Sequence, residues 1–180
     1  MNMNRIRQKY IEQVIPAMQE KMGIKNRLAL PRVEKVTVSV GLSNKDEKLK
    51  DVAPTTLARI TGQKPIITKA KKSIAAFKLR EGQVVGAKTT LRGEKMYSFL
   101  DKLISIALPR VRDFRGIDEH GVDQNGNLTI GFREHLVFGE INPDEVDKIH
   151  GLEVTITTTA KTREQGLEFL KRLGIPFKKN

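Results

Sequence analysis

Basic side chains are the residues of this chain whose type and spacing suggest chemistry most directly. Nine Lys and Arg residues lie within the 32 positions from 64 to 95, where only two acidic residues offset them. Cations at this density neutralise phosphates and release counterions, so they predict a nucleic acid or another polyanion as the partner. Apolar residues interleave with the charges between positions 74 and 79, where they either contact nucleotides or form ordinary strand core. The basic residues are Lys64, Lys69, Lys71, Lys72, Lys78, Arg80, Lys88, Arg92 and Lys95.

No group of residues matches the spacing of a catalytic or metal-binding motif. His120, His135 and His150 are fifteen positions apart, and the chain has no Cys, so the usual zinc spacings and a thiolate nucleophile are excluded. We expect these histidines to be solvated or hydrogen-bonded loop residues. Neither a phosphate-binding glycine loop nor a nucleophile elbow is present. The sequence therefore predicts a protein without catalytic residues, metal or cofactor.

The charge is divided unevenly along the chain. Of 180 residues, 33 are Lys or Arg and 21 are Asp or Glu, which gives a net charge of +12. Residues 59–95 hold 10 basic and 2 acidic groups, whereas residues 116–160 hold 2 basic and 9 acidic groups. This separation predicts two surfaces of opposite sign, although the acidic stretch is also compatible with a solvated face of chance composition. Four of its carboxylates lack the spacing of a calcium loop, and they are Glu140, Asp144, Glu145 and Asp147.

The composition also limits the setting in which the protein works. No apolar run approaches the roughly 18–20 residues of a membrane span, and residues 1–10 do not resemble a secretory signal. We therefore expect a soluble, cytoplasmic protein with no membrane partner. Seven Phe, two Tyr and no Trp favour a protein that binds folded RNA by its shape and backbone over one that stacks single-stranded bases.

The hydrophobic pattern predicts an α+β fold in one domain that spans residues 1–180. Helical periodicity and capping residues predict helices over residues 4–22, with a kink at Pro16, from a cap at Asn44 to Thr61, and over 94–108 and 162–173. Alternation predicts strands at residues 36–40, 65–68, 84–91, 128–132 and 152–159. We expect a mostly antiparallel sheet of about five strands, with helices packed on one face and a long, projecting basic hairpin loop at residues 71–83. The other face of the sheet would carry polar residues such as Thr37, Ser39, Lys88 and Thr90.

An ordered set of short motifs resembles a known family. The segments are Gly62-Gln63-Lys64-Pro65, Lys71-Lys72-Ser73-Ile74-Ala75, Leu79-Arg80-Glu81-Gly82, Gly86-Ala87-Lys88, Thr90-Leu91-Arg92-Gly93 and the run from Pro109 to Gly116. Together they closely resemble bacterial large-subunit ribosomal protein five, which binds 5S ribosomal RNA in the central protuberance. The resemblance runs from the N-terminal helix to the Gly-Ile-Pro-Phe segment at residues 174–177. It implies a structural, non-enzymatic protein of the large ribosomal subunit.

The resemblance also implies which residues bind 5S rRNA. In the family, polar residues on the sheet face bind this RNA, and two of them correspond to Gln63 and Thr90. The third is usually an Asn, and this chain has Ser39 in its place, which is shorter and lacks the second amide group. Neighbouring basic residues would contact phosphates, and they are Lys64, Lys88 and Arg92.

Two further partner surfaces are implied by the resemblance. The long hairpin loop of the family reaches P-site tRNA, and here that contact falls on Lys71, Lys72, Lys78, Arg80 and Gly82. The bridge to small-subunit ribosomal protein thirteen falls on the acidic, partner-facing segment at residues 134–150, with Glu140, Asp144, Glu145 and Asp147 as candidates. Large-subunit rRNA and other proteins of the central protuberance are the remaining expected partners. The alternative reading of the charge is a free-standing architectural nucleic-acid-binding protein.

Overall fold

The computed structural model describes residues 4–42, 47–146 and 148–178. Two residues singled out in the sequence, the helix cap Asn44 and the acidic Asp147, lie outside this part of the chain.

The chain forms two compact units, and each combines segments that are distant in the sequence. Unit 1 comprises Met1–Val36, Leu91–Ile130 and Thr155–Asn180. Unit 2 comprises Thr37–Thr90 and Gly131–Val154. The single domain over residues 1–180 stays a prediction.

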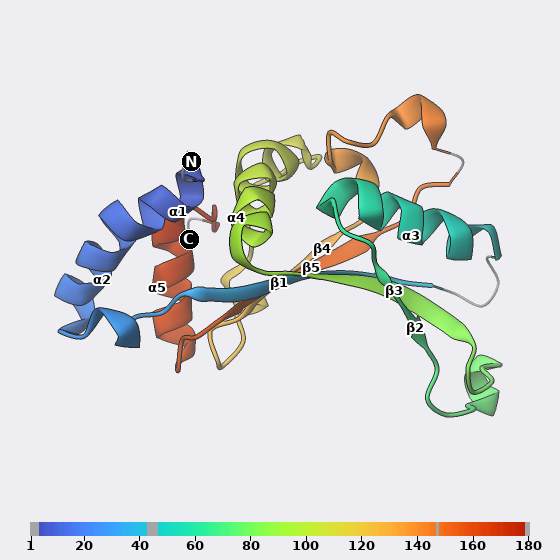
Figure 1. The fold of residues 1–180 in the computed structure, drawn as a ribbon, viewed down its shortest axis with the longest axis horizontal. Helices are drawn as coiled ribbons and strands as arrows, with labels where there is room; N and C mark the ends of the chain where they lie inside the picture. The colour runs from blue at the N-terminus through green and yellow to red at the C-terminus, as the bar shows by residue number, and fades with distance from the viewer. Residues whose placement is uncertain (1–3, 43–46, 147, 179–180) are drawn as a thin grey trace. The chain divides into compact units, whose positions relative to one another are not determined.

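Five strands form one antiparallel sheet in the order β2-β3-β1-β5-β4 (Figure 1). They are β1 (Val33–Gly41), β2 (Ile66–Lys69), β3 (Val84–Leu91), β4 (Leu128–Phe132) and β5 (Leu152–Thr158). In the β2–β3 hairpin, Ile66 pairs with Lys88, and the register shifts between Thr68 and Lys69. The predicted α+β class and the antiparallel sheet of about five strands are confirmed. The projecting loop stays a prediction, and the segment from Ala75 to Phe77 forms a short 3-10 turn.

The N-terminal helix of unit 1 is interrupted before its proline, as the sequence predicted. It consists of α1 (Arg5–Lys9), a π-helical turn η1 (Tyr10–Val14) and α2 (Ile15–Met22). Pro16 has no N–H to donate, and its ring crowds the carbonyl four residues earlier, so the preceding turn widens instead of keeping α-helical pairing. The helix ends at Gly23, whose φ of 65° is in the left-handed region that glycine adopts without strain.

Two further helices complete the core of unit 1. Helix α4 (Gly93–Lys102) continues through a π turn, η4 (Leu103–Ala107), into a 3-10 turn, η5 (Leu108–Arg110), which contains Pro109. Helix α5 (Arg163–Leu173) begins at Thr162, whose hydroxyl accepts a hydrogen bond from the Gln165 backbone N–H. Helix α1 contacts α4, and η1 contacts α5. The most deeply buried large side chains of unit 1 include Met18, Leu100, Leu103, Leu108, Phe169 and Leu170.

Unit 2 buries one face of its strands beneath a single long helix. Helix α3 (Glu47–Thr61) covers that face and contributes Leu49, Ala53, Leu57 and Ile60 to the core (Figure 1). Val38 and Val40 of β1, together with Ala87 and Thr89 of β3, are also buried. Since successive strand side chains alternate between faces, the residues between them point to the opposite, open face.

Close packing of two glycines in unit 1 generates a prediction for stability. A Cβ on Gly166 of α5 would clash with the backbone of Gly126. Ala is favoured over Gly by about 1 kcal/mol inside a helix, but overpacking costs about 1–3 kcal/mol, so we expect Gly166→Ala to lower the free energy of unfolding. Gly131→Ala is the matched control, because its Cβ would meet no atom within 4 Å. Thermal unfolding checks this, and an unchanged or higher melting temperature for Gly166→Ala would contradict it.

Candidate nucleic-acid interface

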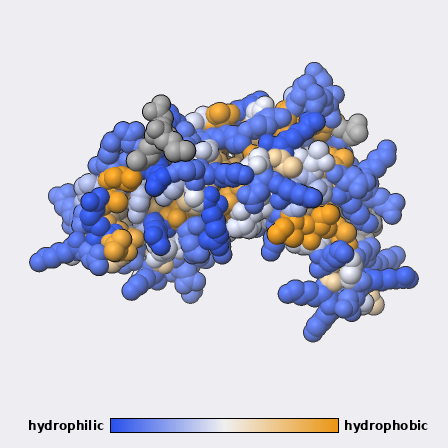
Figure 2. Space-filling view, in the orientation of Figure 1, coloured by the Kyte–Doolittle hydropathy of each residue, from blue (hydrophilic) through white to orange (hydrophobic). Residues whose placement is uncertain are grey.

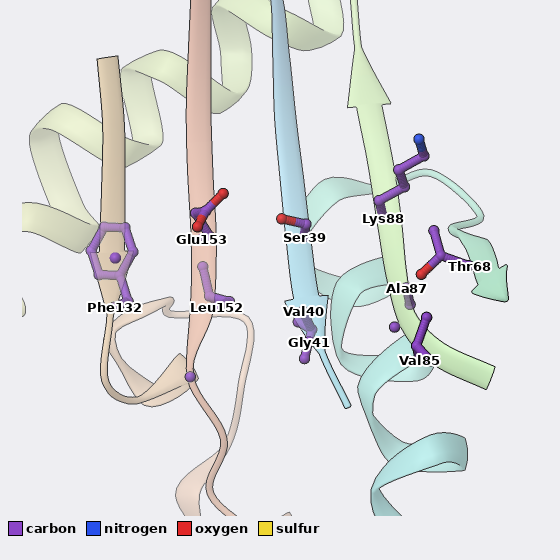
Figure 3. Close-up of a pocket in the computed structure, with 13 residues that line it drawn as sticks. Ser39, Val40, Gly41, Thr68, Val85, Ala87, Lys88, Phe132, Leu152 and Glu153 are labelled. Atoms are coloured by element: carbon purple, nitrogen blue, oxygen red, sulfur yellow. The ribbon is translucent and has the colours of Figure 1, made fainter. Parts of the chain in front are cut away.

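The open face of unit 2 contains a concavity of about 610 Å³ (Figure 3). Residues from β1, β2, β3 and β4 and from the start of β5 line it. Ser39 is on this face because its neighbours Val38 and Val40 are buried on the other one. Lys88 of β3 and Thr68 of β2 line the same concavity, and so does Glu153 of β5 (Figure 3).

Glycines form much of the floor of this concavity. A Cβ on Gly86 would be 2.6 Å from the Val40 carbonyl oxygen, and one on Gly151 would be 2.8 Å from the Phe132 carbonyl oxygen. Packing therefore excludes larger residues at these two positions. Gly41 and Gly131 also line the concavity, but a Cβ on either would meet no atom within 4 Å. Their missing side chains leave the sheet backbone open to a ligand, although folding does not require glycine there.

The structure joins Gln63 to Thr90, two of the residues that the resemblance assigned to 5S rRNA. Gln63 is half-buried just after α3, and its Nε2 donates to the Thr90 carbonyl oxygen at 3.0 Å. This bond orients the amide and leaves its oxygen as an acceptor. Thr61 holds the turn after α3 in place. Its hydroxyl donates a hydrogen bond to the Leu57 carbonyl oxygen at 2.6 Å and accepts one from the Gln63 backbone N–H at 3.4 Å.

The remaining basic candidates of this group are exposed. Lys64 follows Gln63 directly and has an exposed side chain. Arg92 belongs to unit 1, where its guanidinium is 3.5 Å from the Glu34 carboxylate. The structure thus places Ser39 and Lys88 together in the concavity and Gln63 beside Thr90.

Residues 70–83 form an ordered basic hairpin loop in unit 2. Ala70 and Gln83 close it through a 2.8 Å backbone hydrogen bond, and Gly82 donates to the Ala70 carbonyl oxygen at 3.0 Å. All residues from 71 to 78 are exposed. Ile74 is 45% exposed and Phe77 is 70% exposed, so these apolar residues are not strand core. The loop therefore presents apolar and basic side chains on one short structure, with Lys71, Lys72, Lys78, Arg80 and Gly82 among its exposed residues.

The described residues of the acidic segment at 134–150 include two 3-10 turns, His135–Val137 and Pro143–Glu145. Glu140 and Asp144 are exposed. Glu145 is tied to Arg59 of α3 by a 2.9 Å salt bridge. The hydrogen bond from Arg59 is the main reason that the pKa of Glu145 is below its usual value.

Two histidines near the ends of this segment contact each other, and the sequence did not reveal this contact. His135 and His150 are 1% and 6% exposed, and their rings stack with centroids 4.1 Å apart. The backbone N–H of His135 donates to the His150 carbonyl oxygen at 3.0 Å, and the backbone N–H of His150 donates to the ring Nδ1 of His135 at 3.3 Å. Both Nε2 atoms are buried without a hydrogen-bond partner among the described residues. This pair is hydrogen-bonded and His120 is exposed, so each histidine meets one of the two expected alternatives, and the burial and stacking of the pair are new.

The stacked pair predicts a pH dependence of stability. Burial lowers the pKa of His150, and the adjacent His135 lowers it further. The unfolded chain, with an ordinary His pKa of about 6.5, therefore binds more protons than the native state as the pH falls through that value. Stability is then lost on acidification, and we expect the melting temperature to fall between pH 7.5 and 5.5. His150→Gln should flatten this slope.

The exposed His120 provides the matched control. His120→Gln should keep the slope of the unmodified chain in the same thermal unfolding series, because it leaves the buried pair intact. Equal slopes for all three proteins would show that the pair does not govern the acid sensitivity.

The described part of the chain offers no sign of metal or membrane chemistry. It contains no group of three or more His, Cys, Asp or Glu side chains placed to hold a metal ion. No helix in it is long and apolar enough to cross a membrane.

Comparison with known proteins identifies the family. Residues 26–80 match the family profile described as "Ribosomal protein L5", and residues 84–177 match the profile that describes the C-terminus of the same ribosomal protein family. Large ribosomal subunit protein uL5 of Halothermothrix orenii is 52% identical over 177 residues, which is 97% of this chain and 99% of the relative. The proteins of the same name from Streptococcus thermophilus and Streptococcus equi subsp. zooepidemicus are 52% and 53% identical over 178 residues, which is 98% of this chain and 99% of each relative.

The chain therefore belongs to the ribosomal protein L5 family. As a member, it is a structural constituent of the large ribosomal subunit and not an enzyme. Both the resemblance stated from the sequence motifs and the expected ribosomal location are confirmed.

Proposed function

We propose that the open face of unit 2 binds 5S rRNA and helps to attach it in the central protuberance. The observation that carries this proposal is the glycine-floored concavity, in which Ser39 and Lys88 flank exposed strand backbone. A surface of this kind lets an RNA backbone approach closely, with Lys88 available for a phosphate and the hydroxyl of Ser39 available to donate or accept. The Gln63 amide, oriented by the Thr90 carbonyl, supplies a further polar group. Lys64 and Arg92 would add phosphate contacts, and Arg92 is the weaker candidate because Glu34 competes for it.

Binding of P-site tRNA by the basic loop is the second part of the proposal. The backbone hydrogen bonds across residues 70–83 give the loop a defined shape before any partner is present. Phe77 and Ile74 are exposed among the lysines, so they can contact a nucleotide while the cations hold phosphates. The tRNA contacts are assigned to Lys71, Lys72, Lys78, Arg80 and Gly82.

The acidic segment is proposed to face small-subunit protein thirteen across an inter-subunit bridge. Exposed carboxylates at Glu140 and Asp144 suit a basic partner, and each exposed ion pair would contribute only about 0.2–1 kcal/mol. Glu145 already forms a salt bridge with Arg59, so its carboxylate is a weaker candidate for contact with a basic partner. Asp147 stays a candidate from the sequence. Large-subunit rRNA and neighbouring central-protuberance proteins complete the proposed set of partners.

The 5S rRNA and tRNA assignments can be separated by substitution. Gln63→Ala or Lys88→Ala should weaken 5S rRNA binding, by about 1–3 kcal/mol where a buried or charge-assisted hydrogen bond is lost. Lys78→Ala combined with Arg80→Ala should leave 5S rRNA affinity nearly unchanged and lower tRNA affinity. Filter binding at several salt concentrations measures both RNAs. If the loop pair and the sheet residues cause equal losses of 5S rRNA affinity, the proposed separation of the two RNA sites is wrong. Equal affinity for 5S rRNA and duplex DNA would favour an architectural nucleic-acid-binding protein.

The concavity itself can be tested at a position where folding does not need glycine. Gly131→Val adds a side chain to the floor, so we expect 5S rRNA affinity to fall at least tenfold while the melting temperature stays close to that of the unmodified chain. Thr129→Val, an exposed position two residues earlier on β4 that does not line the concavity, is the control. Retained affinity in Gly131→Val would place the RNA elsewhere.

A further inference from the structure

A second groove, about 560 Å³ in volume, lies in unit 1. Arg7, Tyr10 and Ile11 line it from α1 and η1, Ile15 lines it from α2, and Tyr97 lines it from α4. The segment after α2 completes it with Arg27, Leu28, Leu30 and Arg32. This volume is within the roughly 300–1,000 Å³ that sites for small ligands occupy. Figure 2 shows apolar surface in orange among hydrophilic side chains at the end of unit 1 that carries α2.

The charge of the groove is of one sign. Three arginines line it, and none of its described lining residues is a carboxylate. Arg7 pairs with Glu94, whereas Arg27 and Arg32 make no salt bridge with any carboxylate that the structure describes. Both of these arginines are exposed, so their guanidinium groups are available to an anion. Guanidinium groups suit phosphate in particular, because they offer paired N–H donors.

The groove is also aromatic and already formed. The Tyr10 hydroxyl donates to the Pro31 carbonyl oxygen at 3.2 Å, and its ring packs edge-on against Phe169 at 6.0 Å. Leu28 is 90% exposed at the rim, where the Asn26 side chain accepts a hydrogen bond from its backbone N–H at 2.9 Å. Local hydrogen bonds therefore hold the Tyr10 hydroxyl and the backbone of Leu28 in place before any ligand arrives.

We propose that this groove binds an unpaired nucleotide of RNA, separately from the 5S rRNA surface proposed for unit 2. The base would lie against the Tyr and Leu side chains, and the adjacent phosphates would contact Arg27 and Arg32. Unpaired RNA bases stack on aromatic side chains while cations hold the backbone, and the groove offers both. An acidic peptide would use the arginines but would leave the aromatic rings and Leu28 without a matching apolar group.

Intrinsic fluorescence provides a direct test. The chain has two tyrosines and no tryptophan, and both tyrosines line this groove, so tyrosine emission reports on it alone. A single-stranded RNA hexamer should quench this emission to a saturating level, after correction for RNA absorbance with N-acetyltyrosinamide. Polyphosphate of equal charge, which has no bases, should quench weakly. An absence of saturable quenching, or equal quenching by poly-glutamate, would overturn the proposal, and the latter result would assign the groove to acidic protein segments.

Matched variants separate the groove from general charge. Arg27→Gln with Arg32→Gln should weaken the RNA-dependent quenching at least tenfold. Arg110→Gln with Arg115→Gln removes the same charge from exposed positions of unit 1 outside the groove, and its affinity should stay within twofold. Equal losses in the two double variants would reduce the effect to net charge and refute the site.

Three further measurements keep this result independent of other changes. Lys88→Ala should leave the quenching intact, so the groove can fail or succeed independently of the proposed 5S rRNA surface. Far-ultraviolet circular dichroism confirms folding of each variant, and photocrosslinking followed by mass spectrometry should place the RNA on Tyr10 or Tyr97. Crosslinks confined to residues outside the groove would contradict the assignment.

Discussion

The two-residue period of a β-strand is the constraint on which unit 2 depends. Val38 and Val40 can be buried beneath α3 only if Ser39 and Gly41 face the opposite way. The same alternation on β3 buries Ala87 and places Lys88 on the open face. A shift of one residue would exchange the two sets, exposing valines and burying a lysine. The burial that stabilises the unit thus also selects the side chains that a ligand can meet.

Much of the fold could be predicted from the sequence, because local patterns determine it. Alternating Val residues indicated β1, the proline in the first helix indicated an interruption, and Thr162 indicated the start of α5. Each of these signals acts within a few residues. The strand predicted at residues 65–68 is β2, one residue further along the chain. The 3-10 turn at Ala75–Phe77 was not predicted, because hydrogen bonds across the hairpin loop determine it.

The candidate sites depend more on tertiary structure than the fold elements do. Nothing near Gly131 in the sequence connects it with Gly41, and only the sheet order brings both to one concavity. The stacked imidazoles are fifteen residues apart, and the two tyrosines of the groove are 87 positions apart. Periodicity cannot report such pairs. Counting charges along the sequence found the basic hairpin, because its basic residues lie close together in the sequence. It could not show that Glu145 forms a salt bridge with Arg59 whereas its neighbour Asp144 is simply exposed.

The open space above Gly131 separates selection for folding from selection for binding, which usually act together at a buried glycine. At Gly86 a larger residue is rejected during folding, so a faulty chain would be removed by cellular quality control before it reached an assembling particle. At Gly131 a larger side chain meets no atom of the folded protein, so a chain with that substitution would fold and persist at normal abundance. Such a chain could compete with intact copies for its remaining partners. If the concavity binds RNA as proposed, a larger residue on this surface would therefore be recessive in its effect at Gly86 and dominant at Gly131.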